Sequence, residues 1–163
     1  MADDGDYDVA EVCPNGHVST GAADRYPQFR EKFCSQCGEL TTTQCPTCEE
    51  AIRGTYFVAG YLGADDYHPP AHCHNCGTAF PWTQRRIAAA IELLEVDGSL
   101  SNAEITQFRT DLVVMTKDTP QTQVASLRFK KAMLKVGKTV ADGVREIIVS
   151  VLSEVAKDQI KGG

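Results

Sequence analysis

The sequence predicts a small metal-stabilised β region, made of two tandem zinc ribbons, followed by an α-helical C-terminal region. All seven cysteines lie in the first half of the chain, close to one histidine at a matching spacing, and no cysteine, histidine or tyrosine follows Cys76. Beyond Cys76, apolar residues recur at the three- and four-residue steps of amphipathic helices. We therefore expect an acidic N-terminal segment at 1–12, a double zinc ribbon at 13–80 and about three to four helices at 81–163.

Eight side chains that can bind zinc form four close pairs along the chain. Three pairs have the Cys-x-x-Cys spacing, which lets two thiolates reach one ion at about 2.3 Å, and the fourth pairs a cysteine with a histidine across a Pro-Asn-Gly turn. Because structural zinc takes four protein ligands, eight ligands predict two Zn²⁺ ions. The predicted ligands are Cys13, His17, Cys34, Cys37, Cys45, Cys48, Cys73 and Cys76.

The segments between these pairs predict how the pairs combine. Sixteen residues separate the first pair from the second, 7 the second from the third, and 24 the third from the fourth. This alternation favours a long hairpin inside each site, so that pairs one and two hold one metal and pairs three and four hold the other. A cross-brace, in which the first pair shares a metal with the third, satisfies the same ligand count and stays open.

Residues around the ligands indicate tight turns and short strands. Gly38 and Gly77 follow the second cysteine of their pairs, where a turn needs a positive φ. The β-forming run 55–61 and the residues before Cys13 predict short hairpin strands. Few large apolar residues lie between 13 and 80, so we expect bound metal to supply most of the stability of this region.

Three further histidines lie close to the last cysteine pair: His68, His72 and His74. They are alternatives to His17 as the eighth ligand, but a second site with four cysteines has no vacancy for them. With Asp65 and Asp66 they could also form an acid/base or open metal site. No nucleophile pattern accompanies that cluster, so we expect these histidines to lie outside the ligand sets.

The C-terminal half contains recognisable helix boundaries. Thr83 is expected to cap a first helix that ends at Asp97 and Gly98 and buries a face from Ile87 to Leu94. Ser101 and Glu104 form a capping box for a second helix. The buried side of this second helix is expected to comprise Ile105, Phe108, Leu112 and Met115.

A third helical stretch is expected to begin at Thr119-Pro120 and to continue almost to Ile160, with Gly137 and Gly143 as breaks or bends. An apolar stripe runs along it from Val136 to Val155, and we interpret the stripe as core packing rather than a partner or membrane surface.

Five basic residues and no acid lie between Thr119 and Ala141: Arg128, Lys130, Lys131, Lys135 and Lys138. This amphipathic cationic stretch could contact an acidic protein surface, nucleic acid or an anionic membrane. Alternatively, it is a solvated face that balances the chain's own acids. Those acids include Asp3, Asp4, Asp6, Asp8 and Glu11.

The chain's first residues are acidic, where a secretory signal would have a basic segment followed by an apolar one. No apolar run approaches the roughly 18 residues of a membrane span. We therefore expect a cytoplasmic protein, in whose reducing surroundings cysteines bind metal rather than form disulfides.

The histidine- and proline-rich run from Tyr67 to Thr83, which ends in Pro-Trp-Thr, accompanies all four ligand pairs. From about Cys13 to Thr83 the chain resembles an uncharacterised bacterial family of double zinc ribbon proteins, a domain of unknown function. The resemblance implies two zinc ribbons followed by helices in a bacterial cytoplasmic protein. It implies no activity, substrate or partner.

The sequence favours an adaptor that binds another protein and is not an enzyme, since no phosphate loop, His-Glu-x-x-His helix or nucleophile elbow occurs. Nucleic-acid binding is the alternative, but a net charge of −6 disfavours it. A third hypothesis, iron-based redox or ligase-like chemistry, has no specific residue pattern behind it. For the nucleic-acid alternative, the residues that could bind phosphates are those of the basic helix together with Arg25, Arg30, Lys32, Arg85 and Arg86.

Overall fold

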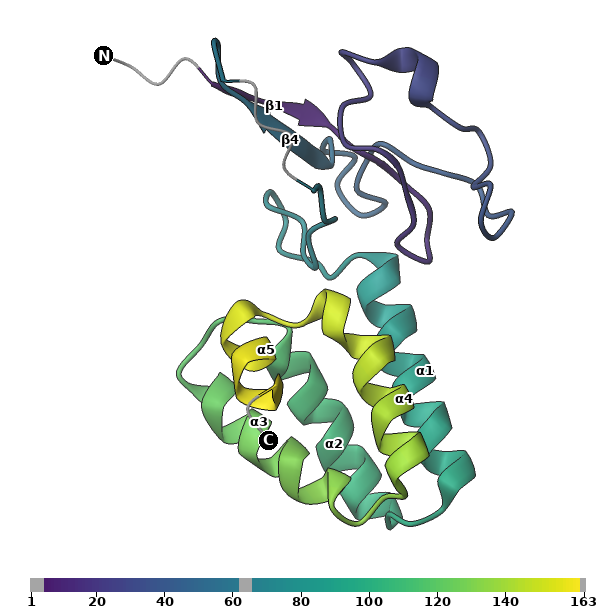
Figure 1. Cartoon of the computed structure of the whole chain (residues 1–163), viewed down its shortest axis with the longest axis vertical. Coiled ribbons are helices and arrows are strands. Elements are labelled where there is room, and N and C mark those ends of the chain that lie inside the picture. Colours follow the sequence, from purple (N-terminus) through teal and green to yellow (C-terminus); the bar gives the residue numbers. More distant parts are fainter. Residues whose placement is uncertain (1–4, 62–65, 162–163) are drawn as a thin grey trace. The chain divides into compact units, whose positions relative to one another are not determined.

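The structure is a computed structural model that describes residues 5–61 and 66–161. The chain divides into unit 1, at 1–83, and unit 2, at 84–163. Unit 1 contains short strands and most of the irregular backbone, while helices make up unit 2 (Figure 1). The predicted fold class, a small β region followed by helices, is confirmed. Asp3, Asp4 and Asp65 lie outside the described residues.

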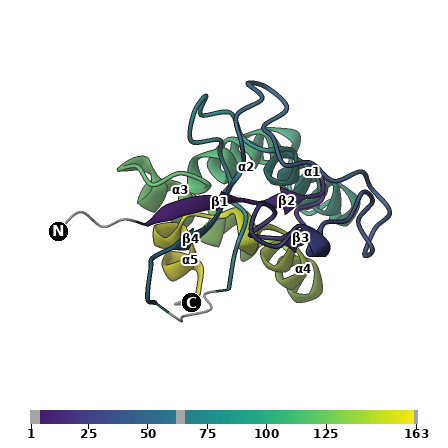
Figure 2. The ribbon, with the colours of Figure 1, turned by 90° about the horizontal axis from the view of Figure 1, so that it is seen from above.

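The strands of unit 1 form two antiparallel pairs, β1 with β4 and β2 with β3 (Figure 2). Their bounds are β1 Asp6–Val9, β2 Glu11–Val12, β3 Val18–Thr20 and β4 Arg53–Phe57, with a short 3₁₀ helix, η1, at Pro27–Phe29. The strand predicted at 55–61 thus occurs at 53–57, but it pairs with the acidic N-terminal segment rather than within its own hairpin. Gly54 permits the close approach of these segments, because a Cβ there would lie 2.9 Å from the Asp8 carbonyl oxygen of β1 and 2.1 Å from the Gly21 carbonyl oxygen.

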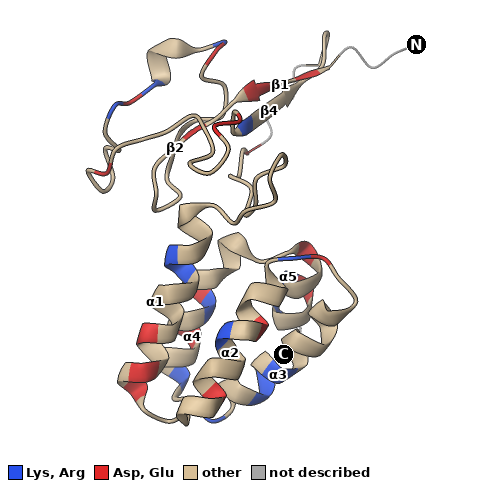
Figure 3. Cartoon of the chain, turned by 180° about the vertical axis from the view of Figure 1, so that it is seen from behind, with Lys and Arg blue, Asp and Glu red and all other residues tan. Residues whose placement is uncertain are grey.

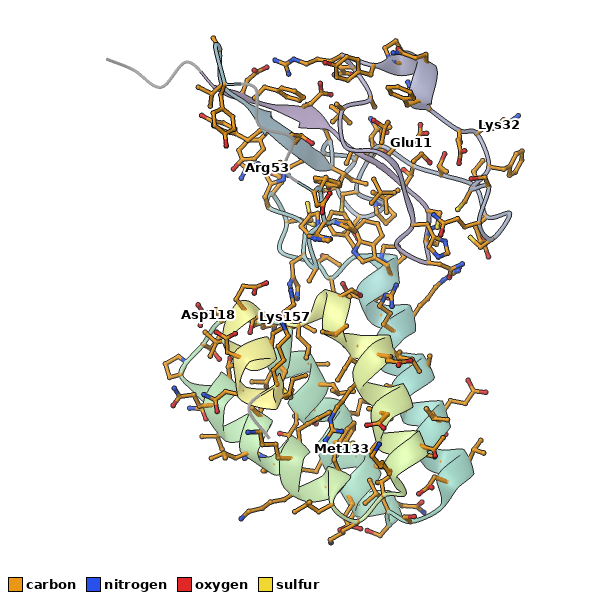
Figure 4. All side chains as sticks on the ribbon, in the orientation of Figure 1. Glu11, Lys32, Arg53, Asp118, Met133 and Lys157 are labelled. Atoms are coloured by element: carbon orange, nitrogen blue, oxygen red, sulfur yellow. The ribbon has the colours of Figure 1, made fainter. Side chains whose placement is uncertain are left out.

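Two buried carboxylates of the N-terminal segment fix the long loop that follows β3. Asp8 accepts hydrogen bonds from the backbone N–H groups of Asp24 and Arg25, at 3.0 and 3.2 Å. Glu11, labelled in Figure 4, accepts from the Glu31 N–H at 2.6 Å and from Arg30 Nε at 2.9 Å. These acids therefore bind their own unit and do not balance the basic stretch of the helical half.

The apolar core of unit 1 is small. Trp82 and Phe80 stack at 4.4 Å between ring centroids, and both are buried. The indole Nε1 of Trp82 donates to the Pro70 carbonyl at 2.9 Å. Apart from cysteines, the other buried hydrophobic residues described here are Ala10, Val12, Ala22, Ala23 and Ile52. Such a core cannot by itself fix a unit of this size.

The helices are α1 Pro81–Asp97, α2 Asn102–Met115, α3 Gln121–Met133, α4 Lys138–Ile148 and α5 Glu154–Lys161, with a 3₁₀ turn, η2, at Val149–Val151. The expected N-cap at Thr83 is wrong. The helix begins two residues earlier, at Pro81, which needs no N–H partner, and the Thr83 hydroxyl donates to the Ala71 carbonyl at 2.8 Å. Gly98, at φ +72°, follows the end of α1 as predicted.

The capping box of α2 is confirmed, with Ser101 and Glu104 each bonding the other's backbone N–H. The long C-terminal stretch breaks twice and gives three helices, so the described residues hold five α-helices where three to four were expected. Gly137 precedes α4, but Gly143 lies inside it. The second break is before α5, where the Ser153 hydroxyl accepts from the Ala156 N–H at 3.3 Å.

Apolar residues from every helix form the core of unit 2. Phe108 of α2 and Phe129 of α3 meet at 5.2 Å between ring centroids, and Met133 points in among the helices (Figure 4). Val144 and Ile148 of the C-terminal stripe belong to the same buried cluster. The interpretation of the stripe as core packing is confirmed. No helix in the described ranges is long and apolar enough to cross a membrane.

Asp8 and Asp6 offer a matched test of the buried carboxylates, because both contact Arg25. The side chain of Asp8 is 1% exposed and that of Asp6 is 68% exposed. We expect Asp8→Ala to lower the free energy of unfolding by about 2–3 kcal/mol, since it leaves buried N–H groups unpaired. Asp6→Ala should lower it by less than about 1 kcal/mol. Denaturant titration followed by Trp82 fluorescence measures both, and equal effects would contradict this account.

Candidate metal centres

The eight predicted ligands form two groups of four. Within each group, all the ligand atoms lie within 4.8 Å of one another. One group contains Cys13, His17, Cys34 and Cys37, and the other contains Cys45, Cys48, Cys73 and Cys76. The pairs therefore combine in sequential order, as the segment lengths predicted, and the cross-brace does not occur.

The distances within each group can be compared with a tetrahedral zinc site. Zinc–sulfur bonds of about 2.3 Å place two sulfurs about 3.8 Å apart, and a sulfur and an imidazole nitrogen about 3.6 Å apart. The Sγ atoms of Cys13 and Cys37 lie 3.7 Å apart. His17 Nδ1 lies 3.5 Å from the Sγ atoms of both Cys13 and Cys34.

The second group has the same dimensions, with 3.8 Å between Cys45 and Cys76 and 3.7 Å between Cys48 and Cys73. A disulfide would hold its sulfurs at about 2.0 Å. Each group thus has the size of a four-coordinate metal shell and could hold one metal ion. His17 supplies its Nδ1 atom to the first group, and four sulfurs make up the second.

Three of the ligand pairs lie on separate backbone turns of the same type. In each, the N–H of the first cysteine donates to a carbonyl five residues later, and its own carbonyl accepts from the N–H four residues later, at 2.8 to 2.9 Å. The residue after the second cysteine has a positive φ in all three turns: Gly38, Glu49 and Gly77. Glu49 is the only non-glycine residue with positive φ in the described ranges. The sequence did not predict a positive φ at this position, because that prediction depends on glycine, which only the other two turns have.

The first ligand pair lies on a different turn, which packs against the aromatic core. The Cys13 N–H donates to the His17 carbonyl at 3.0 Å, and Gly16 has φ +86°. A Cβ on Gly16 would lie 3.0 Å from Trp82 Cβ. The Trp82 side chain therefore leaves no room for a side chain at this turn, which lies between two candidate ligands of the first group.

Hydrogen bonds to sulfur favour the thiolate form that binds metal. Bonds from the Glu39 backbone and the Asn15 side chain lower the pKa of Cys37 to about 6, and bonds from Thr78 lower the pKa of Cys76 to about 6. Burial raises the pKa of Cys13, and it raises the pKa of Cys73 to about 11. A bound cation would offset this burial effect, since coordination deprotonates a thiol.

Two asparagines are contacts that sequence reasoning missed. Asn15 Nδ2 lies 3.3 Å from Cys37 Sγ, across the first group. Asn75 Nδ2 lies 3.5 Å from Cys48 Sγ, across the second. Each asparagine sits between the two ligands of one pair and reaches a cysteine of the other pair in its group. Both asparagines lie between the two ligands of a pair, and this shared position could have predicted their contact with a cysteine sulfur.

The other three histidines lie outside both groups. His68 is exposed, and the backbone of His72 forms an antiparallel β-bridge with Ala79. His74 Nε2 lies 3.9 Å from a carboxylate oxygen of Glu50. Among the described residues they join no third group of ligand atoms, and neither does Asp66.

A family model described as "Uncharacterized protein conserved in bacteria (DUF2321)" matches residues 6–160. The chain belongs to this family. The DUF2321 match includes the helices as well as the ribbons, so it is wider than the resemblance between Cys13 and Thr83. No curated protein and no solved structure matches the chain.

Replacing His17 tests the composition of the first group. We expect the wild type to carry two metal ions and His17→Ala to fall toward one, because three thiolates leave the tetrahedron incomplete. His68→Ala, His72→Ala and His74→Ala are the matched controls and should keep two ions. Elemental analysis of protein purified without added metal gives the ratio. Loss of an ion in a control variant, with two retained in His17→Ala, would reassign the ligand.

Chelation tests whether the two units depend differently on metal. EDTA at mildly acidic pH should unfold unit 1 first, because protons compete with metal for thiolate and imidazole. Trp82 fluorescence should change with metal loss, since the indole packs on Gly16. Far-ultraviolet circular dichroism should retain most of the helical signal. Collapse of the helices in the same step would show one cooperative structure.

Proposed function

We propose that this protein is a cytoplasmic zinc-binding module that binds another protein and carries out no catalysis of its own. The observation that carries the proposal is the combination of two closed four-ligand groups with a strongly acidic ribbon unit. The module interpretation is supported by ligand chemistry, by charge and by exposed apolar side chains.

The ligand chemistry supports zinc as the metal. Thiolate-rich tetrahedra with four protein ligands are the usual structural zinc sites, whereas catalytic zinc keeps one position for water or substrate. Both groups have four protein ligands within 4.8 Å of one another. Their role in this proposal is therefore to stabilise the ribbons. The elemental analysis described above also identifies the metal, and stoichiometric iron would contradict zinc.

Charge favours a protein partner over nucleic acid. Unit 1 contains twelve acidic and four basic residues, a formal charge of −8, and unit 2 has a formal charge of +2. Figure 3 shows acidic residues on β1 and β2. Two of the four basic residues are held in ion pairs, Arg25 with Asp6 and Asp8 and Arg30 with Glu11. The charge of the ribbon unit therefore disfavours phosphate binding.

Apolar side chains on the ribbon surface also support a protein partner. The residues flanking the three similar turns differ: Phe33 opposes Leu40 in one, while the others pair Gln44 with Ala51 and His72 with Ala79. Phe33 and Leu40 are 57% and 56% exposed. Aromatic side chains are enriched at protein interfaces, and here an exposed phenylalanine lies opposite an exposed leucine.

Affinity capture tests the proposal. The zinc-loaded full chain, used as bait in a lysate of a bacterium that carries a family member, should retain a protein at stoichiometric level. Nuclease treatment of the lysate should leave this retention unchanged, because an acidic ribbon unit does not bind phosphate backbones. Retention of RNA or DNA, or loss of the protein after nuclease treatment, would favour the nucleic-acid alternative. No retained protein would contradict the module.

A further inference from the structure

A groove of about 280 Å³ runs between α2 and α3 in unit 2. Its lining includes Glu104, Gln107 and Phe108 from α2, Arg128 and Lys131 from α3, and Lys135 from the turn after α3. Phe108 is buried and forms an apolar floor. Ion pairs join residue 104 to residue 135 and residue 111 to residue 128, which shows that the two helices run antiparallel.

Most of the basic stretch is neutralised inside the unit. Arg128 binds the buried carboxylate of Asp111 through Nε at 2.9 Å and Nη2 at 2.6 Å. Lys135 pairs with Glu104, and Lys138 pairs with Asp142 at 3.2 Å. Three of the five cations between 119 and 141 therefore form ion pairs with acids of α2 and α4.

Lys131 is the exception within the groove. The antiparallel order places it opposite Gln107 and Phe108, between the two ion pairs, and Gln107 Nε2 donates to Asp111 Oδ1 at 3.1 Å. No ion pair involving Lys131 occurs in the part of the chain that the structure describes, and its side chain is exposed. A third acid, at the middle of the groove, would complete the row of pairs.

Exposed apolar residues border the same position. Val124, Leu127 and Leu134 are 43%, 56% and 87% exposed. Residues three or four apart are neighbours on a helix surface, so Leu127 and Leu134 flank Lys131 on the two sides along α3. The buried face of α3 is formed by other residues, including Phe129 and Met133. The outer face of α3 thus carries exposed apolar side chains. Lys130 and Lys131 both lie beside Leu127 and Leu134 and form no ion pair in the described ranges, and of the two only Lys131 lines the groove. Figure 3 shows the basic residues on this helix.

We propose that this surface binds an acidic amphipathic helix of the partner protein, an inference that rests on the proposed function. One carboxylate of the partner pairs with Lys131, and its apolar side chains cover Val124, Leu127 and Leu134. Because α3 has 13 residues, and a helix rises about 1.5 Å per residue, the matching helix has three to four turns. Glu104 and Asp111 also line the groove. Arg128 and Lys135 pair with them, so the lining has a formal charge of +1, which suits a single carboxylate beside Lys131 rather than a row of phosphates.

Selection from a displayed library of random 16-residue peptides tests the proposal, with the zinc-loaded full chain as target. The enriched peptides should carry an aspartate or glutamate with apolar residues three or four positions away, as a helix requires. Lys131→Glu should weaken a selected peptide at least about tenfold, which is the size of losing a charge-assisted contact. Lys131→Arg should retain binding within about threefold.

Lys117→Glu is the matched control, since it makes the same charge change at an exposed lysine outside the groove lining and away from Leu127 and Leu134. It should alter affinity less than about twofold, and Leu134→Ser should weaken binding without changing charge. No enriched peptide, enrichment of basic peptides, or equal binding to Lys131→Glu would overturn the proposal. Lys131-dependent binding of RNA or of anionic lipid vesicles would overturn it as well.

The two proposals fail in different ways. A partner captured from lysate with equal efficiency by Lys131→Glu and by wild type would overturn the proposal that the groove binds the partner, but would still support a protein-binding function. Capture of nucleic acid in place of protein would overturn the module itself. Circular dichroism and metal content of each variant confirm its fold, which should be unchanged because Lys131 is exposed.

Discussion

Closure of two four-ligand groups is the constraint on which unit 1 depends. The described strands have two to five residues each, and an isolated two-stranded pair of this length is marginally stable in water. The buried apolar residues are few, and four cysteines are themselves buried among them. Metal binding at thiolate sites can supply free energy of about 10 to 16 kcal/mol, which is enough to fold a small module. Two ions bound at these ligands would thus give unit 1 the stability that a hydrophobic core gives unit 2.

This constraint also explains the buried acids. The segment of 16 residues between the first two ligand pairs buries only two of its apolar side chains, Ala22 and Ala23. Asp8 and Glu11 anchor it by accepting backbone N–H bonds and pairing with Arg25 and Arg30. Charged groups that are buried with both hydrogen bonds and a counter-charge are tolerated, whereas the same groups unpaired are strongly unfavourable. The acidic N-terminal segment is consequently a structural part of the ribbon unit.

The sequence predicted what depends on local spacing. Cys-x-x-Cys steps, the Ser101 capping box and the glycine after α1 each place their partners within a few residues, so their geometry follows from short-range rules. The β1–β4 pairing joins residues 44 to 51 positions apart in short strands, and no local rule specifies such a register. The partner of Arg128 was equally hidden, because Asp111 lies 17 residues away on another helix. Thr83 was misassigned since its hydroxyl bonds outside its own helix.

Formal charge along the chain is therefore a poor guide to the surface that a partner meets. Five cations and no acid between 119 and 141 suggested a broad basic face. In the structure, however, three of these cations form ion pairs with Asp111, Glu104 and Asp142. Lys130 and Lys131 form no ion pair in the described ranges, and of these only Lys131 lines the groove. The fold thus reduces five cations to two without an ion pair, of which one lies at the groove, and a cation placed in this way discriminates between partners by position rather than by total charge.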